Sequence, residues 1–473
     1  MSTLNKKRTA AGVMFVTAFC CAVHAQQTTL PAAPQVHLLI AAAEQAPMQN
    51  TDASATAGQS SSAQAEAGPR LTIAEAEQMA IRNNPNIGVA RLLALAQAQV
   101  TREARSAELP TATGDLTAVE SHLDSRITAG SLNNSSIYDR AAGGLTVSQL
   151  ITDFGRTHNL VLSAKSNARA QLENERATEL DITLTVDQAF YEALTAQAVL
   201  RVAQQTVAQR QATGDQVTAL TKAKIKSDLD LSFANVQVSQ ANLMLVDARS
   251  NEQAAMAALD DVLGLETDQQ YTLVDETDGN PPAAPEDTEA LVKSALGERP
   301  DLAAMNDESL AAKQYSTAQR DLWMPTVSAL AAVGGTPVRA DQIQSSWYGA
   351  AGANISIPVF NGFLFNAEAK EAKLRAQADD EKVRNLRDMV ARDVRTAVLN
   401  AQAAFQRIAV TQDMLKQANL ALDLAQARYK IGLSSIVELT QAQLAQTEVE
   451  IANTSARYAY QTALAEVRYQ VGQ

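Results

Sequence analysis

The stretch R-Y-K-I-G-L-S-S-I-V-E-L-T-Q-A, Arg428–Ala442, separates two of the longest segments of the chain that lack both proline and glycine. These segments are residues 363–431 before Gly432 and residues 433–471 after it. Glycine readily adopts the left-handed backbone that ends a helix, and the two serines that follow are good helix caps. The stretch therefore predicts a hairpin between two long helices. On its own, an ordinary structural turn would explain the pattern.

Composition favours extended helices over one thick globular core. Of the 473 residues only 4% are aromatic, and alanine and glutamine recur throughout. The formal net charge of −13 disfavours binding to nucleic acid. No run of about 18 apolar residues occurs past Ala25, so no membrane-spanning helix is expected. If the chain enters a membrane, it must do so as a β-barrel.

The N-terminus has the pattern of a secretion signal. Basic residues at positions 6–8 precede the apolar run Ala10–Val23, and small residues surround a cleavage site after Ala25. We predict a signal peptide at residues 1–25, since the run is too short to anchor the chain across a bilayer. Both cysteines lie inside it, which leaves no disulfide or thiol nucleophile afterwards. Residues 26–69 have no sustained period and are interpreted as a flexible extension.

The rest of the chain repeats itself. Pro85 and Pro300, and likewise Pro110 and Pro325, lie 215 residues apart in similar surroundings, whereas Gly264 and Gly472 lie 208 apart. Two constant offsets over this length indicate a duplication. We predict a first repeat at residues 70–280 and a second at residues 281–473.

Each repeat is expected to contain an opening helix, two strands, a long helix and a returning helix of about half its length. The predicted helices are Ile73–Leu109, Arg156–Lys222 and Asp228–Leu263 in the first repeat, and Thr288–Leu322, 363–431 and Ile436–Val471 in the second. The long helices would be about 100 Å each. On the last helix, a narrow face of mostly small residues suits close antiparallel packing. It comprises Leu439, Ala442, Ala445, Ala452, Ala456, Ala459 and Ala463.

The strand segments, such as those around Ala142 and Ala329, alternate apolar with small or polar residues over about ten positions. This length fits a tilted membrane strand, but a soluble hairpin would give a similar pattern. Four strands cannot close around water, and open edges are not tolerated in lipid. Strands in a membrane would therefore require an oligomer, for which three copies and twelve strands are the natural number.

At this point the sequence resembles the TolC family of outer-membrane efflux and secretion channels, over about Leu71–Gly472. The resemblance is carried by short motifs at matching places of the two repeats and at the hairpin. They are Asn84-Pro85, Arg299-Pro300, Leu109-Pro110, Met324-Pro325, Val147–Gly155, Ile355–Gly362, Arg428–Leu439 and Val471-Gly472.

The resemblance implies a mainly α fold with a small β part, built from tandem-duplicated antiparallel helical hairpins. It implies a homotrimer with a twelve-stranded barrel in the outer-membrane lipid of a Gram-negative bacterium and a helical tunnel in the periplasm. The channel would be the exit duct of a tripartite efflux or type I secretion system. A periplasmic adaptor would dock at the helical tips and link it to an inner-membrane pump.

The resemblance also suggests gate residues. By similarity, Glu438 and its repeat equivalent Asp230 belong to an acidic constriction, and Tyr429 matches a latch tyrosine. Gln441 replaces a second acid of the family pattern, and Ser434 replaces a basic residue that would pair with Asp230. We therefore expect a gate with fewer charges and a different latch. Without the resemblance, Glu438 would be read as a solvated acid at a helix start.

The tips themselves are expected to dock the adaptor. Lys224 aligns with Gly432, so the first turn must close without glycine. The candidate docking residues are Lys224, Ile225, Lys226, Ser227, Ile431, Gly432, Leu433 and Ser435.

The sequence contains no recognisable reaction centre, and no cofactor or metal is expected, because no histidines stand at metal-ligand spacing and no phosphate loop or nucleophile elbow occurs. The acidic runs at Asp260-Asp261 and Asp379–Glu381 fit solvated helix faces. The alternative from another class is a soluble periplasmic coiled-coil adaptor or scaffold. The sequence does not indicate which substrate, a drug, a metal or a secreted protein, would be transported.

Overall fold

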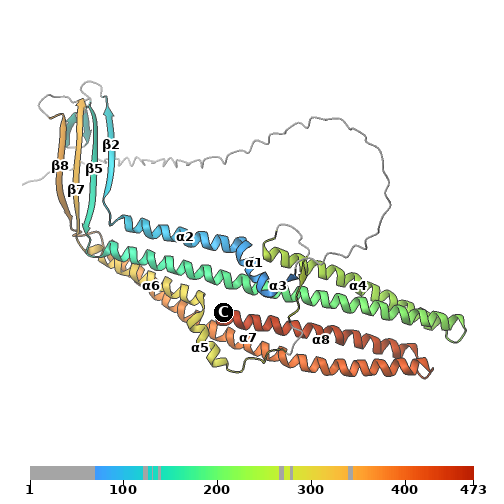
Figure 1. Cartoon of the computed structure of the whole chain (residues 1–473). Coiled ribbons are helices and arrows are strands. Elements are labelled where there is room, and N and C mark those ends of the chain that lie inside the picture. Colours follow the sequence, from blue (N-terminus) through green and yellow to red (C-terminus); the bar gives the residue numbers. More distant parts are fainter. Residues whose placement is uncertain are drawn as a thin grey trace, which may run out of the picture. The chain divides into compact units, whose positions relative to one another are not determined.

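The computed structural model describes residues 70–120, 126–129, 132–136, 140–265, 271–276, 281–338 and 345–473 (Figure 1). The described residues belong to one compact unit. The predicted signal peptide and the predicted extension at residues 26–69 lie outside the described residues. The fold is mainly helical with a small sheet part, as the sequence predicts.

The four longest helices agree closely with the predictions. The long helices are α3, Arg156–Lys222, and α7, Leu364–Lys430, with 67 residues each. The returning helices are α4, Asp228–Leu263, and α8, Ile436–Val471, with 36 residues each. Helices α3 and α4 pack together, as do α7 and α8, and α3 also packs against α8 (Figure 1).

The opening helices differ from the prediction, because a proline divides each of them. The first repeat has α1, Ile73–Asn83, and α2, Pro85–Ser106. The second has α5, Thr288–Glu298, and α6, Pro300–Arg320, followed by a short 3-10 turn. Proline cannot donate the helical hydrogen bond, and it pushes the residue before it into extended backbone.

Asn84 and Arg299 precede these prolines, and each has extended backbone with ψ near 122° and 123°. Asn84 then caps α2, because its side-chain oxygen accepts the backbone N–H of Asn86 at 2.9 Å. The two breaks occupy equivalent places in the repeats. Each opening segment therefore consists of two shorter helices beside a continuous long helix.

Each returning helix ends directly against one of these breaks. Gly264 ends α4 with φ +70°, and a Cβ there would lie 2.8 Å from the backbone oxygen of Asn83. Gly472 ends α8 with φ +92°, and a Cβ there would lie 3.1 Å from the backbone of Arg299. Only glycine fits both the left-handed backbone and this close approach. The matched glycines of the sequence are therefore the joints between opening and returning helices.

The predicted four strands form one antiparallel sheet in the order β2–β5–β7–β8 (Figure 1). They are β2, Thr111–Val119; β5, Arg140–Thr152; β7, Thr326–Val338; and β8, Trp347–Ser356. The pairing of β5 with β7 joins the two repeats in one sheet. A further antiparallel pair, β3 at Arg126–Ala129 with β4 at Leu132–Ser136, was not predicted.

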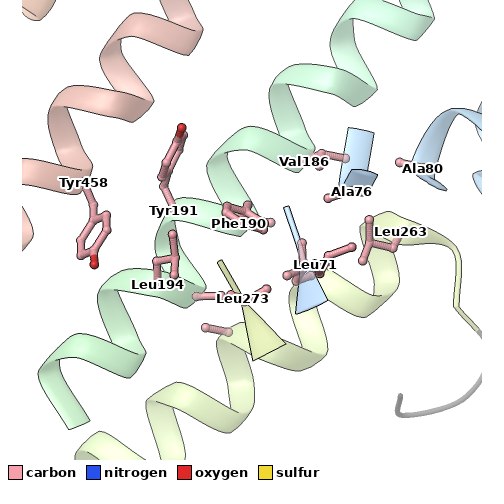
Figure 2. Packing of buried hydrophobic residues seen from close by; sticks show 14 of the residues in the cluster. Leu71, Ala76, Ala80, Val186, Phe190, Tyr191, Leu194, Leu263, Leu273 and Tyr458 are labelled. Atoms are coloured by element: carbon pink, nitrogen blue, oxygen red, sulfur yellow. The ribbon is translucent and has the colours of Figure 1, made fainter. Parts of the chain in front are cut away.

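A second unpredicted feature is a two-stranded parallel sheet that covers the main core. Strand β1, Arg70–Leu71, pairs with β6, Thr272–Leu273. Figure 2 shows Leu71 and Leu273 directed toward Phe190 of α3 within this buried cluster. Tyr458 of α8 joins the cluster, and its hydroxyl donates to the carboxylate of Asp275 at 2.6 Å. The core therefore ties the first repeat to the last helix.

The predicted packing face of α8 is confirmed in part. Leu439 and Ala456 are buried, and Ala442 and Ala463 pack against buried clusters, whereas Ala445, Ala452 and Ala459 are exposed. A more regular alanine stripe occurs on α4, where Ala234, Ala241, Ala248 and Ala255 are buried at intervals of seven residues. Of the helices in the described ranges, none has the length and apolar character needed to cross a membrane.

Candidate functional site at the helical tips

Two tight turns join the paired helices. The first tip, residues 222–227, connects α3 to α4, and the second tip, residues 430–435, connects α7 to α8 (Figure 1). They are the turns that the repeat predicts to be equivalent. Their side chains include every residue that the sequence singled out for docking.

The two tips close with the same backbone hydrogen bond. The N–H of Ile225 in the first tip, and that of Leu433 in the second, each lies 2.9 Å from a carbonyl oxygen in the last turn of the preceding helix. This geometry requires a left-handed residue just before the donor. Gly432 fills that position with φ +79°, and Lys224 fills it in the first tip with φ +58°. The first turn thus closes without glycine, as predicted, by placing a lysine in a strained conformation.

The two acids predicted to form the constriction have different partners. Asp230 belongs to a capping box, in which its carboxylate accepts the backbone N–H of Ser227 at 3.2 Å and the hydroxyl of Ser227 at 3.0 Å. The backbone N–H of Glu438 donates to the hydroxyl of Ser435 at 3.3 Å. The carboxylate of Glu438 does not join a capping box as that of Asp230 does; it lies 3.7 Å from the guanidinium of Arg428. Glu438 is exposed, whereas Asp230 is half-buried.

Tyr429 connects the two tips through its ring. The side chain is 3% exposed, and the ammonium group of Lys226 lies 4.3 Å from the ring centroid. The Tyr429 hydroxyl is buried and has no hydrogen-bond partner among the described residues. Burial, and secondly the charge of Asp230, raise the pKa of the phenol. The contact between the tips is therefore a cation–π contact.

Apolar packing beneath the tips joins the two hairpins. The buried cluster draws residues from α3 and α4 of one hairpin and from α7 and α8 of the other. Its members are Val217, Ala234, Leu422, Ala425, Tyr429, Ile436 and Leu439. Any movement that separates the hairpins at this end must expose part of this cluster.

The two departures from the family pattern lie close by. Ser434 is half-buried, and its hydroxyl has no hydrogen-bond partner within the described ranges. Gln441 is exposed on α8, one turn past Glu438. A cation is nevertheless present, because Arg428 approaches Glu438 from the end of α7. The acid of the second repeat thus has a basic neighbour that the sequence comparison with the family did not indicate.

Most of the candidate docking residues are exposed. The exposed ones are Lys224, Ile225, Ser227, Ile431, Gly432, Leu433 and Ser435. Lys226 is half-buried, since it lies over the Tyr429 ring. The outward surface of the tips therefore combines lysine, serine and large aliphatic side chains.

A buried pair that sequence reasoning missed links the hairpins deeper down. Arg210 of α3 is 4% exposed and donates to the side-chain oxygen of Gln443 of α8, which is 1% exposed. Gln443 also donates to the hydroxyl of Thr213 at 3.3 Å. Burial lowers the pKa of Arg210 to about 10. No carboxylate within the described ranges forms an ion pair with this guanidinium.

No signal in the sequence could have revealed this pair. The repeat-equivalent positions hold Ala418 and Asn235, so the duplication gives no guide to it. As for metals, no three His, Cys, Asp or Glu side chains in the described part of the chain gather in a way that could hold an ion.

The comparisons with known proteins agree on one family. The model of the family described as outer membrane efflux protein matches residues 76–265 and 291–473. The outer membrane protein TolC of Salmonella enteritidis is 24% identical over 347 residues, which cover 71% of this chain and 69% of that protein. The outer membrane efflux protein BepC of Brucella suis is 23% identical over 403 residues, which cover 82% of each.

A solved structure has the same fold. The crystal structure of CusC superimposes with a TM-score of 0.74 at 20% sequence identity, covering 85% of this chain and 92% of that one. Since the family model matches more than half of the chain, the resemblance read from the motifs is confirmed at the level of the family.

Proposed function

The chain belongs to the outer membrane efflux protein family, and on that premise we propose that it is a homotrimeric channel, the exit duct of a tripartite efflux or type I secretion system. Its two tips form the periplasmic gate and receive a periplasmic adaptor, which links the duct to an inner-membrane pump. The observation that carries the proposal is that a single copy leaves matching edges uncovered at both sides of its sheet and of its helical layer.

The sheet has two free edges. Strands β2 and β8 are its outer members, and they run in opposite directions because each neighbouring pair is antiparallel. Strand β8 of one copy can therefore continue the antiparallel order against β2 of the next. Leu116 on β2 is 93% exposed, and Ile355 on β8 is 62% exposed. Three copies would give twelve strands without a free edge, as strands in lipid require.

The helical layer also ends in two uncovered apolar faces. The long and returning helices pack side by side in the order α4, α3, α8, α7, so α4 and α7 are the outer members. On α4, Leu229, Val236 and Leu243 lie seven residues apart and are 65%, 51% and 63% exposed. On α7, Val410 and Leu424 are 58% and 57% exposed, two heptads apart. Heptad spacing on both faces suits coiled-coil packing.

The two faces belong to different helices, so a contact between them is heterologous and closes into a ring only by rotation. A two-fold dimer would cover one face twice and leave the other in water. This supports a ring, and the sheet count supports three members. The same rotation would place three copies of each tip around one axis.

In such a ring the acids of the tips would line the aperture. Three Glu438 and three Asp230 carboxylates in a narrow opening select for cations and against anions. We propose that the gate in this chain has two parts, an acidic ring at the aperture and the Lys226–Tyr429 contact that holds the two hairpins together.

The test is the single-channel conductance of the purified protein in planar bilayers. The wild type should conduct with a preference for cations, and the double variant Glu438→Ala, Asp230→Ala should lose that preference. Glu103→Ala, which removes an exposed acid of α2 away from the tips, is the matched control and should keep it.

Two results would contradict the proposal. Unchanged selectivity in the double variant would contradict the acidic ring at the aperture. Recovery of the protein in the aqueous periplasmic fraction, without a heat-modifiable trimer on a gel, would contradict the channel function and favour the soluble adaptor or scaffold.

A further inference from the structure

We propose that Gly144 of β5 and Gly334 of β7 form a seat that holds the ring of Tyr348 of β8 against the sheet, and that this seat sets the width of the duct at that level. Tyr348 is then a residue that determines the size of the cargo that passes. The inference goes beyond the proposed function but rests on it, because the seat has this role only inside a closed ring of strands.

Tyr348 belongs to a row of four residues that crosses the whole sheet. Asp115 of β2 pairs with Gly144, Gly144 pairs with Gly334, and Gly334 pairs with Tyr348. Residues directly opposite each other in an antiparallel sheet lie on the same face. The side chain of Tyr348 therefore has two positions without a side chain next to it on its own face.

The ring of Tyr348 occupies the space above both glycines. A Cβ added at Gly144 would overlap the hydroxyl end of the ring, and a Cβ added at Gly334 would overlap the same end. The side chain therefore extends from β8 across β7 to β5, along the surface of the sheet. Glycine weakens the interior of a strand, so two glycines under one ring indicate a need for this close approach.

The face that carries this row is the polar one. Its members on β2 are Thr111, Thr113, Asp115 and Thr117. The opposite face is apolar, and on it Leu116 of β2 is 93% exposed and Trp347 of β8 is 67% exposed. Where strands cross a membrane, apolar positions face the lipid and polar positions face the lumen. The ring of Tyr348 is therefore assigned to the lumen side.

Tyr348 is the one aromatic side chain on the polar face of the described strands. The next row toward the helices contains only small side chains, which are Thr113, Thr146, Ala332 and Ala350. The ring is 42% exposed, so part of it is open to the lumen. A trimer would carry three such rings at one level. Seated rings leave the duct open, whereas displaced rings would project into it from three sides.

Gly144 is the position at which the seat can be tested. The nearest atom that a Cβ would meet there is the hydroxyl oxygen of Tyr348, at the free end of a side chain that can change its rotamer. At Gly334 a Cβ would also lie 2.6 Å from the carbonyl oxygen of Gly143, so the backbone would have to shift. Gly144→Ala should therefore displace the ring, and the lumen is the open space beside it.

The experiment records single channels of the full-length protein in planar bilayers, with polyethylene glycols of graded size added only at the sheet end of the duct. Polymers that enter the duct lower its conductance, and the largest polymer that does so defines the size cut-off. Addition at this end prevents the tips from deciding which polymers enter. Gly144→Ala should shift the cut-off to smaller polymers, and adding Tyr348→Ala to it should restore the wild-type cut-off.

Two single variants complete the series. Tyr348→Ala alone should leave the cut-off near the wild-type value, because a seated ring already lies outside the path of the cargo. Gly352→Ala is the matched control, since Gly352 of β8 lies on the same face and a Cβ there meets no atom within 4 Å. Its cut-off should equal that of the wild type.

An unchanged cut-off in Gly144→Ala would overturn the proposal. A clearly larger cut-off in Tyr348→Ala would also overturn it, because the ring would then project into the lumen of the wild type. This second result decides the question even if Gly144→Ala forms no oligomer. Failure of the proposed function is a different result, namely the absence of any conductance from the wild-type protein.

Discussion

Arg468 of α8 donates to the carboxylate of Asp187 of α3 at 3.1 Å, and this ion pair joins the second repeat to the first. Asp187 is 3% exposed, and its other carboxylate oxygen is buried without a hydrogen-bond partner among the described residues. The side chain of Arg468 is half exposed, so water screens its attraction. The pair is therefore a weakly compensated charge within a packed region.

The first prediction concerns pH. Burial raises the pKa of Asp187 from its ordinary 3.8 to about 7 against the attraction of Arg468, and Glu77 of α1 contributes to the rise. The folded chain then holds a proton that the unfolded chain releases between about pH 4 and pH 7. Stability contributed by this group is full below pH 4 and is lost as pH rises to about 7. Asp187→Asn should flatten this decline in melting temperature.

The matched control for that series is Asp181→Asn, because Asp181 is exposed on the same helix, where its carboxylate accepts a hydrogen bond from the hydroxyl of Tyr469. A decline of equal slope in the wild type and in Asp187→Asn would contradict the assignment.

The second prediction concerns the buried pair of Arg210 and Gln443. Gln443→Leu removes the acceptor and leaves a buried guanidinium without it, at a cost of about 3 kcal/mol in the free energy of unfolding. Combining it with Arg210→Met replaces both polar groups by apolar ones and should recover most of that loss. The measurement is thermal unfolding of the three variants. Gln441→Leu, exposed on the same helix, should have little effect.

A double variant no more stable than Gln443→Leu alone would show that the loss comes from packing rather than from the unpaired charge.

The third prediction separates the ring of Tyr429 from its hydroxyl. The hydroxyl has no partner, so Tyr429→Phe should leave the gate unchanged. Lys226→Met removes the cation over the ring, worth about 1 kcal/mol, and should raise the open probability roughly fivefold. Single-channel recording measures both. If Tyr429→Phe opens the channel as much as Lys226→Met does, the hydroxyl is the latch and the cation–π contact is not.

The fourth prediction concerns the sheet. Gly144 of β5 and Gly334 of β7 are cross-strand partners, and a Cβ on either would overlap the ring of Tyr348 of β8. Gly144→Ala should therefore weaken the sheet and lower the temperature at which the oligomer dissociates on a gel. Tyr348→Ala should restore it in the double variant, because the ring is then gone.

Gly352→Ala is the control for the sheet, since a Cβ there meets no atom within 4 Å. An equal loss in Gly352→Ala would point to glycine's role in strand flexibility rather than to the ring contact.

The ends of the helices could be predicted from the sequence where a capping residue marks them. The bounds of α4 and α8 were predicted correctly because Ser227, Ser435, Gly264 and Gly472 are caps that lie in the chain itself. The breaks before Pro85 and Pro300 were missed, although proline provides a clear local reason for them.

Contacts between distant helices could not be predicted in the same way. The pairing of Arg210 with Gln443, and of Lys226 with Tyr429, depends on how α3, α7 and α8 are rotated about their axes. Alanine-rich heptads permit more than one rotation, which is why the predicted face of α8 included the exposed Ala452 beside the buried Ala456. The equivalence of Lys224 and Gly432 was predicted, because a constant repeat offset needs no knowledge of rotation.

The joints at Gly264 and Gly472 have a mechanical consequence. Helices α3 and α7 are continuous over their whole length. Beside each of them, the opening helix is divided at a proline, and the returning helix ends against that division. Below the joint, a returning helix of about 54 Å acts as a lever arm, so a tilt of about 10° would displace its far end by about 9 Å. A small rotation at mid-height is thus magnified into a large change of aperture.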